Sequence, residues 1–391
     1  MTSKGRHDEP DEDPGPLSIF DRDEDREPDP DDPDAPGPDG DGPGPGPAPR
    51  RRRGRRLLAW TLAVLLVLVG GAFGGLLWAA DHYASSVRRI PDAFPTLPAS
   101  AQPPAVPHSG QTFLLVGLDA RSDEPTTGKD AKAPAWQVGA QRSDTMMLMH
   151  ISADRKSVAL VSIPRDTWVP VPGHGKAKIN AAYSWGGPAL TVQTVQDLTG
   201  IRIDHLAVID WNGFRALTDA VGGVDITIPR TIEAKGDARE WLAGTHHMDG
   251  AEALLYVRER HGLPGGDLDR TKRQQNFLRS LMLKTMSSGT LASPSKLTGL
   301  LGTIGDVASV DDRLSNTDLY DLAWSLRDIR PDGVHFMNAP FGGFDTVDGQ
   351  DVVLMDDGAA SVLWTAMRTD RMDDYLTEHR TSADTLGRDV S

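Results

Sequence analysis

The chain has no cysteine among its 391 residues. This absence excludes thiol catalysis, disulfide bonds and cysteine-ligated zinc sites. A Walker A phosphate loop and a G-x-S-x-G nucleophile elbow are also missing, so the sequence does not indicate a P-loop nucleotidase or an α/β-hydrolase. His246 and His247 have no third metal ligand at a useful spacing.

Large apolar residues are scarce in residues 1–49, which carry 16 Asp/Glu against 4 Lys/Arg and many prolines and glycines. Such a segment cannot bury enough apolar surface to offset the entropy lost on ordering. Residues 50–56 then reverse the charge, with six arginines in seven positions. We expect residues 1–56 to be a disordered acidic tail that ends in an arginine run.

Charge is absent from residues 57–80, an apolar run of 24 residues. As a helix it would be about 36 Å long, enough to cross a bilayer core of about 30 Å. Trp60 and Trp78 lie near its two ends, where interfacial aromatics are typical. Because the arginines precede the span, the sequence predicts a single-pass cell-membrane protein. Its N-terminus would be cytoplasmic, and residues 81–391 would be extracellular. A cleaved signal peptide is the alternative, which the length of the apolar run disfavours.

The extracellular portion is itself acidic. The whole chain has a charge of −15, of which the tail contributes −12 and the arginine run +6, leaving −9 for residues 81–391. This balance argues against general binding of nucleic acid or other polyanions. Residues 81–110 are polar and rich in proline and predict an extracellular linker. We expect one globular domain at residues 111–370 and a polar C-terminal tail at residues 371–391.

Strand and helix patterns alternate along the globular domain. Short apolar runs predict strands at 113–117, 145–152, 157–163, 206–211 and 224–228. Helical spacing of apolar residues predicts helices at 213–223, after Asp249, and at 271–286. The polar tetrapeptide 153–156 between two strands predicts a hairpin. This alternation is typical of an α/β domain with a largely buried sheet.

Arginines and isolated carboxylates fall at the ends of these predicted elements. They are Asp119, Arg142, Asp144, Arg165, Asp166, Arg258, Arg260 and Arg270, and Gln274 accompanies Arg270. Each alone is explained as a cap or a surface ion pair. Arg258 and Arg260 would share a face if extended, and Arg270 and Gln274 share a helical face. Together, carboxylates for a hard cation and arginine forks for phosphate oxygens indicate a Mg²⁺–pyrophosphate site.

Residues 111–290 resemble the LytR-CpsA-Psr family of cell-wall ligases. The resemblance rests on ordered motifs: G-x-D-x-R at 117–121, RSDTMML at 142–148, VALVSIPRDTW at 158–168, WNGFRALTDAVGGVD at 211–225 and D-x-x-R-x-x-R-Q-Q at 267–275. It implies a three-layer α/β/α sandwich around a central mixed sheet, with a lipid-binding tunnel. It also implies a phosphotransferase that moves a glycopolymer from a polyprenyl-pyrophosphate carrier to peptidoglycan.

The resemblance assigns roles to individual positions. Asp119 and Asp144 match the family's Mg²⁺-associated aspartates. Its pyrophosphate-binding positions are matched by Arg142, Arg165, Arg258, Arg260, Arg270 and Gln274, of which Arg165, Arg258 and Arg260 are the expected catalytic arginines. Asp166 and Asp267 are candidates to accept the proton of the attacking hydroxyl. Leu118 and Asp269 depart from the family pattern without touching these positions.

Other functions remain compatible with the same residues. A pyrophosphatase would use water as the acceptor at the same site. A non-enzymatic lipid-binding or regulatory membrane protein would need the arginines but not the aspartates. A DNA-binding regulator is opposed by the predicted topology, which exports the folded domain. The sequence leaves open which glycopolymer is transferred, the length of the lipid and the oligomeric state.

Overall fold

A computed structural model describes residues 87–107, 110–120, 125–228, 230–233, 239–259, 267–287 and 293–379, all within one compact unit. The predicted acidic tail and membrane helix lie outside these residues, as do Arg260 and the last part of the predicted C-terminal tail. Among the helices that are described, none combines the length and apolar character needed to cross a membrane.

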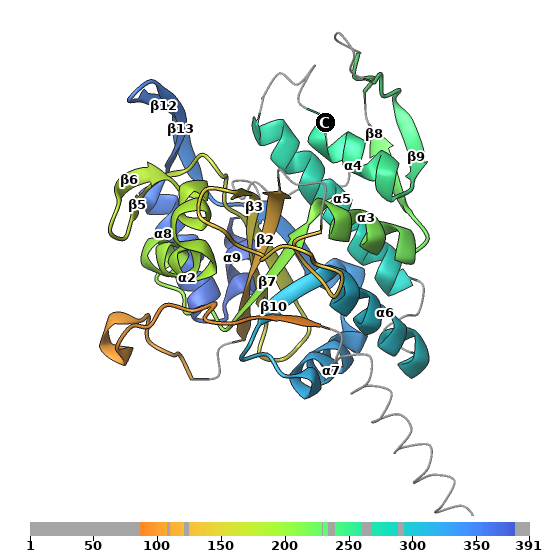
Figure 1. Ribbon diagram of the computed structural model, residues 1–391, viewed down its shortest axis with the longest axis horizontal. Coiled ribbons are helices and arrows are strands. Elements are labelled where there is room, and N and C mark those ends of the chain that lie inside the picture. Colours follow the sequence, from red (N-terminus) through yellow and green to blue (C-terminus); the bar gives the residue numbers. More distant parts are fainter. Residues whose placement is uncertain are drawn as a thin grey trace, which may run out of the picture. The chain divides into compact units, whose positions relative to one another are not determined.

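A seven-stranded mixed sheet forms the centre of the domain (Figure 1). Its strands in spatial order are β1 (Arg88–Ile90), β10 (Ala308–Asp311), β7 (His205–Asp210), β2 (Gln111–Ala120), β3 (Gln141–Ile151), β4 (Val158–Ser162) and β11 (Val334–Asn338). β3 pairs antiparallel with both β2 and β4, which confirms the predicted hairpin. β7 runs parallel to β2, and β11 runs parallel to β4. The carboxyl ends of β2, β4, β7 and β11 therefore meet at one edge of the sheet.

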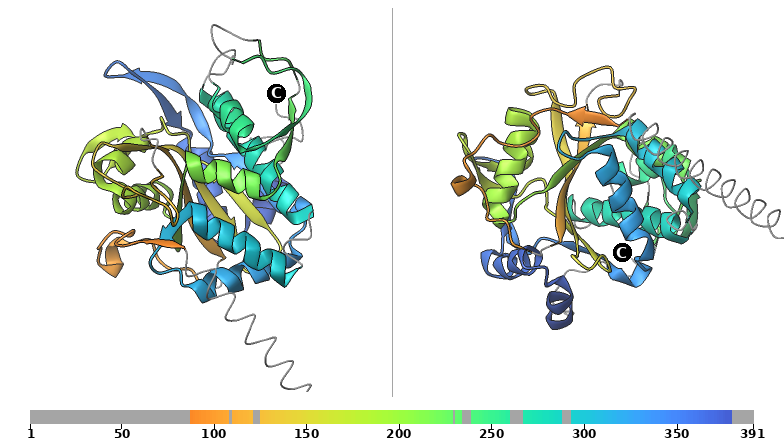
Figure 2. Two further views of the ribbon diagram at one scale, coloured as in Figure 1. Left: turned by 45° about the vertical axis from the view of Figure 1, so that its right-hand side comes forward. Right: turned by 90° about the horizontal axis from the view of Figure 1, so that it is seen from below.

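Helices cover both faces of this sheet, which confirms the predicted three layers (Figures 1 and 2). One face carries α2 (Asn180–Thr199), α8 (Asp357–Arg368) and α9 (Met372–Glu378). The other carries α3 (Trp211–Ala220), α4 (Gly250–Arg258), α5 (Asp267–Ser287), α6 (Pro294–Val307) and α7 (Asn316–Ser325). Successive strand residues pack into opposite layers: Leu148 joins the α2 cluster, and Met147 the cluster that Leu278 of α5 packs against. Burial on both faces explains why these strands are continuous apolar runs.

Three hairpins and three short 3₁₀ turns complete the fold. The hairpins are β5 (Trp168–Val171) with β6 (Gly175–Lys178), β8 (Val224–Ile228) with β9 (Gly244–Met248), and β12 (Phe341–Val347) with β13 (Gln350–Met355). The turns are η1 (Ala99–Ala101), η2 (Leu326–Asp328) and η3 (Pro331–Gly333). The β5–β6 and β12–β13 hairpins lie side by side, because Thr167 bridges to Val353 and the Val353 N–H donates to the Asp166 carbonyl at 3.0 Å.

Two predicted boundaries of the globular domain are wrong. Residues 81–110 were expected to be a linker, yet β1 pairs with β10, and Ala93 and Phe94 are buried in the α2 cluster. Residues 371–391 were expected to be a polar tail, yet Met372 and Tyr375 of α9 are buried in the same cluster. Both segments are too short and too polar to signal their positions locally. Their order comes from partners far away in the chain.

Asp311 at the end of β10 links the stability of this fold to pH. Its buried carboxylate accepts hydrogen bonds from the Leu206 N–H at 2.9 Å and the Arg313 N–H at 3.0 Å, and it lies 3.3 Å from His205 Nδ1. Burial by itself would raise the pKa of Asp311, but the hydrogen bonds and His205 outweigh it and lower the pKa below the usual range.

A depressed carboxylate pKa contributes stability that is fully present above the unfolded-state pKa of about 3.9 and is lost as pH falls through the folded-state pKa. We therefore expect Asp311→Asn to lower the free energy of unfolding by about 2 kcal/mol at pH 7 and to reduce the loss of stability below about pH 4. Urea unfolding at a series of pH values measures both effects. An unchanged pH profile in the variant would contradict the assignment.

Candidate functional site

The sequence-predicted residues converge at the sheet edge where the parallel strands end. Asp119 lies at the end of β2, directly opposite Arg142 at the start of β3, and Arg165 follows β4. Open α/β sheets place ligands at this edge, since side chains that follow the strands project into the same space. Residues that are more than twenty positions apart in sequence are thereby brought together.

Asp144 and Arg165 form the most buried ion pair of this site. Arg165 Nη1 donates to Asp144 Oδ1 at 2.7 Å, with the Asp144 side chain 7% exposed and the Arg165 side chain 20% exposed. Asp166 extends the pair, because its carboxylate lies 3.5 Å from Arg165 Nε and 3.0 Å from Lys178 Nζ. Asp166 is therefore shared by two cations. This arrangement orients Arg165 and ties it to the β5–β6 hairpin.

A second group surrounds Asp119. The Trp211 indole N–H donates to Asp119 Oδ1 at 3.0 Å, and Arg258 Nη2 lies 3.7 Å from the same oxygen. The Arg258 guanidinium also stacks over the Trp211 ring, 5.2 Å from its centroid. Half of the Arg258 side chain stays exposed. The Arg258 guanidinium is thus held beside the Asp119 carboxylate while it stays exposed to solvent.

Arg258 ends helix α4 and is not extended, so the condition under which Arg258 and Arg260 would share a strand face is not met at Arg258. The helix begins at Asp249, whose carboxylate caps the Ala251 and Glu252 N–H groups at 2.9 Å. A basic residue in the last turn suits the negative end of the helix. The residue Arg260, named with Arg258 as catalytic, lies outside the described part of the chain.

Helix α5 brings the remaining predicted residues to the same edge. Gln274 is buried and its Oε1 accepts a hydrogen bond from Thr145 Oγ1 of β3 at 2.9 Å. Asp267 and Arg270 lie in the first turn of α5, about two turns and one turn before Gln274, respectively. Arg273 stacks over the Tyr256 ring of α4 at 5.2 Å. Burial raises the pKa of the Tyr256 phenol, an effect that Arg273 partly offsets, so Tyr256 packs as a neutral group between α4 and α5.

Three residues of the site were not predicted from the sequence: Trp211, Thr145 and Lys178. Each contacts a predicted residue through its side chain. Thr145 directly follows Asp144 and Trp211 opens a predicted helix, so both lay within recognised motifs. Lys178 had no local signal, because its contact with Asp166 depends on how the β5–β6 hairpin folds back.

Within the described residues, no group of three or more His, Asp or Glu side chains is placed to hold a metal ion by itself. Asp119 and Asp144 lie on adjacent strands, and one oxygen of each is within 4 Å of an arginine. Two carboxylates fit a hard cation that takes its other ligands from substrate phosphates and water, as Mg²⁺ commonly does. They do not make a closed protein-only metal site.

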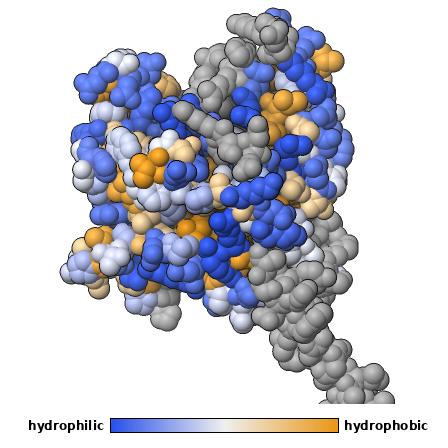
Figure 3. Space-filling view, in the orientation of Figure 1, coloured by the Kyte–Doolittle hydropathy of each residue, from blue (hydrophilic) through white to orange (hydrophobic). Residues whose placement is uncertain are grey.

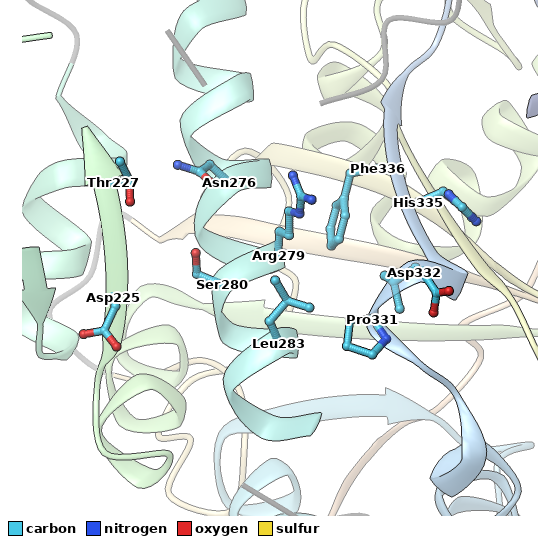
Figure 4. A pocket seen from close by; sticks show the side chains of 11 residues that line it. Asp225, Thr227, Asn276, Arg279, Ser280, Leu283, Pro331, Asp332, His335 and Phe336 are labelled. Carbon is cyan, nitrogen blue, oxygen red and sulfur yellow. The ribbon is translucent and has the colours of Figure 1, made fainter. Parts of the chain in front are cut away.

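A cleft of about 680 Å³ lies elsewhere, across the outer side of α5 (Figure 4). Asn276, Arg279 and Ser280 of α5 line it between Asp225 of β8 and His335 of β11. Burial lowers the pKa of His335, with nearby carboxylates opposing the shift. The cleft contains none of the predicted site residues, and Leu283, Val334 and Phe336 line it together with the charged side chains.

Comparison with known proteins gives the family. A sequence model of the LytR_cpsA_psr family matches residues 97–369. The chain belongs to the LytR_cpsA_psr family. This match covers well over half of the sequence and includes every described residue of the site.

Two relatives and one solved structure illustrate the similarity. The chain is 34% identical over 311 residues to the probable cell wall biosynthesis protein LcpB of Corynebacterium glutamicum, covering 80% of this chain and 70% of LcpB. It is 28% identical over 326 residues to the polyisoprenyl-teichoic acid–peptidoglycan teichoic acid transferase TagU of Bacillus cereus, covering 81% of this chain and 97% of TagU. A structure of TagT bound to LI-WTA has 25% sequence identity and a TM-score of 0.51, covering 68% of this chain and 91% of TagT.

Proposed function

We propose that this protein is a phosphotransferase that moves a glycopolymer from a polyprenyl-pyrophosphate carrier to peptidoglycan in cell-wall assembly. The observation that carries the proposal is the cluster of arginines and carboxylates at one sheet edge, in a chain of the LytR_cpsA_psr family. The relative TagU is named for a transfer of this class. Arginine forks suit the non-bridging oxygens of a pyrophosphate.

In the proposed reaction, a sugar hydroxyl of peptidoglycan attacks the phosphorus that bears the glycopolymer. A new P–O bond forms, and the bond from this phosphorus to the bridging oxygen breaks. Polyprenyl phosphate leaves with that electron pair, and the hydroxyl proton passes to a base, for which Asp267 is the proposed group. Arg165 and Arg258 would hold the charge that develops on the phosphate oxygens. Asp166 positions Arg165, since it is shared with Lys178.

Asp119 and Asp144 would hold a Mg²⁺ ion together with the substrate's phosphate oxygens. The chemistry that these two carboxylates would supply by holding the ion is neutralisation of part of the phosphate charge. The two carboxylates would also keep Arg258 and Arg165 in place through their ion pairs. Arg142, opposite Asp119 on β3, and Arg270 and Gln274 of α5 would complete the pyrophosphate site.

We expect Asp119→Asn to raise the Mg²⁺ concentration for half-maximal transfer about tenfold, because a neutral amide is a weaker ligand for a hard cation. Stability should change little, since one third of the Asp119 side chain is exposed. Thermal shifts with Mg²⁺ and inorganic pyrophosphate give a second readout that does not depend on turnover. Asp225→Asn, at an exposed carboxylate paired with His247, is the control. Equal Mg²⁺ dependence in both variants would count against the metal assignment.

The proposed function also requires a membrane anchor and a binding path for the lipid. Residues 57–80 would anchor the domain in the cell membrane with the N-terminus in the cytoplasm, within reach of a lipid-linked substrate. The prenyl chain would need an apolar tunnel. Leu278 of α5 packs with Met147 and Leu160 of the sheet in one buried apolar cluster, which has the composition that such a path needs.

The direct test uses the full chain in lipid nanodiscs with Mg²⁺, a polyprenyl-pyrophosphate oligosaccharide and a peptidoglycan oligomer. The expected product is a phosphodiester-linked adduct, detected by its mass. A pyrophosphatase would release the phosphorylated oligosaccharide whether or not peptidoglycan is present. Hydrolysis without an adduct would overturn the proposed transfer.

A further inference from the structure

Exposed apolar side chains gather beside the site, at the amino-terminal part of α2. Trp185 is 40% exposed and stacks on His174 at 4.8 Å between centroids, with 27° between the ring planes. His174 is at the tip of the β5–β6 hairpin, between Gly173 and Gly175, whose φ angles of 77° and 78° favour glycine. The backbone of this turn is therefore built to hold His174 against an exposed tryptophan.

Two further side chains extend this feature. Val138 is 70% exposed, and the next residue ties its loop to α2, because the Gly139 N–H donates to the Ser184 carbonyl at 3.0 Å. Phe344 is 64% exposed on β12, in the neighbouring hairpin, 5.9 Å from Phe341. We call Val138, His174 and Trp185 the hairpin surface, and Phe344 lies on the neighbouring hairpin. Figure 3 shows a mainly hydrophilic face with separate apolar patches. The Trp185–His174 pair differs from a lone exposed residue, because a ring contact and two glycines hold it in place.

The hairpin surface is fixed to the predicted site by the backbone. The Asn180 N–H donates to the Arg165 carbonyl at 3.2 Å, and Trp185 follows five residues later on α2, about 8 Å along the helix axis. The Val353 N–H of the second hairpin donates to the Asp166 carbonyl. Gly139 precedes Arg142 by three residues. A polymer that crosses this surface would therefore reach the arginine cluster within a few units.

The chemistry of the hairpin surface suits a polysaccharide with acidic substituents. Flat aromatic rings stack against the C–H faces of pyranose sugars, which are apolar although the sugar rims are polar. Lys176 is exposed next to the turn, and Lys178 lies on the same strand. The exposed Lys176 complements the carboxylates of peptidoglycan stem peptides, whereas Lys178 is already paired with Asp166.

The position of the surface favours the acceptor over the donor. Arg258 and Gln274 come from α4 and α5 on one side of the site, whereas the hairpin surface stands on the side of β5–β6 and α2 (Figures 1 and 2). In phosphoryl transfer the attacking and leaving oxygens lie roughly in line, on opposite sides of the phosphorus. Resting on the function proposed above, we infer that the hairpin surface binds the glycan strand of the peptidoglycan acceptor.

The test measures binding of purified, lipid-free peptidoglycan glycan strands to the full chain in nanodiscs, without donor. Trp185→Ala should weaken binding about fivefold, and Trp185→Phe should largely retain it, because stacking needs a ring. The matched control is Trp324→Ala. Trp324 is 37% exposed and stacks with Arg327 at 4.8 Å, but it lies on α7, away from the hairpins (Figure 1). In transfer assays, Trp185→Ala should raise KM for the acceptor and leave kcat near that of the parent.

Two outcomes would overturn the inference. One is that Trp185→Ala binds glycan strands as tightly as Trp324→Ala with its urea midpoint unchanged. The other is that it weakens binding of a lipid-free phosphorylated donor oligosaccharide but not of the strands. Failure of the proposed transfer looks different: the parent would bind strands through Trp185 and still form no adduct. If Trp185→Ala does not fold, His174→Ala, which removes the ring stacked on Trp185, should weaken strand binding, and unchanged binding in that variant would overturn the inference.

Discussion

Replacing Arg165 with alanine is expected to reduce glycopolymer transfer about a thousandfold, the range seen when an arginine that stabilises a phosphoryl transition state is lost. Arg165 is the predicted arginine with the strongest ion pair in the described site, at 2.7 Å to Asp144. Arg165→Lys should recover only a small part of the activity, because an ammonium lacks the planar fork. Mass detection of the phosphodiester adduct, normalised to folded protein, measures the effect.

Arg165→Ala will also lower stability, by about 3 kcal/mol, since it leaves the mostly buried Asp144 carboxylate without this cation. The double variant Arg165→Ala/Asp144→Ala removes both charges and shows whether transfer is lost when stability is largely restored. It should regain much of the lost free energy of unfolding while transfer stays absent. If the double variant transferred glycopolymer at the parent rate, Arg165 would be a structural residue only.

Arg258→Ala is expected to reduce transfer about a hundredfold or more while the free energy of unfolding changes by less than about 1 kcal/mol. The small effect on stability follows from exposure: 52% of the Arg258 side chain is accessible, and its ion pair with Asp119 is long, at 3.7 Å. Chemical unfolding and the transfer assay on the same preparation measure both quantities.

Arg239→Ala provides a matched control for this variant. Arg239 also stacks over a tryptophan, Trp241 at 4.6 Å, pairs with a carboxylate, Glu252 at 2.9 Å, and has the same exposed fraction of 52%. It is not among the residues at the carboxyl edge of the sheet. Transfer should be unchanged in Arg239→Ala. Equal losses in the two variants would show that the stacked arginines act through stability and not through the substrate.

The sequence predicted the elements whose signals are local. Apolar runs marked β2, β3, β4, β7 and β8, and the acidic residue before an apolar helical run marked α4, whose cap is Asp249 as expected. These predictions hold because alternation, burial on both sheet faces and capping act over a few residues. The β1 strand and α9 were missed, because a three-residue edge strand and a short acidic helix owe their order to distant packing.

Some residues of the candidate site were predicted from the sequence, and their contacts were not. The motifs named Asp119, Arg142, Asp144, Arg165 and Gln274, and the structure places all five at one edge of the sheet, which the parallel course of β2 and β4 makes possible. Their partners could not be read from the sequence. Trp211 reaches Asp119 across 92 positions, and Thr145 reaches Gln274 across 129.

The sequence by itself determined the family, the α/β class and the charged residue types of this site, since these depend on ordered motifs and short-range patterns. Only the tertiary structure decided which cation faces which carboxylate. It placed Arg258 on a helix end over Trp211, joined Asp166 to Lys178, and set Trp185 and His174 beside the site. Such contacts depend on long-range chain reversal and on the packing of hairpins, which no local pattern of residues encodes.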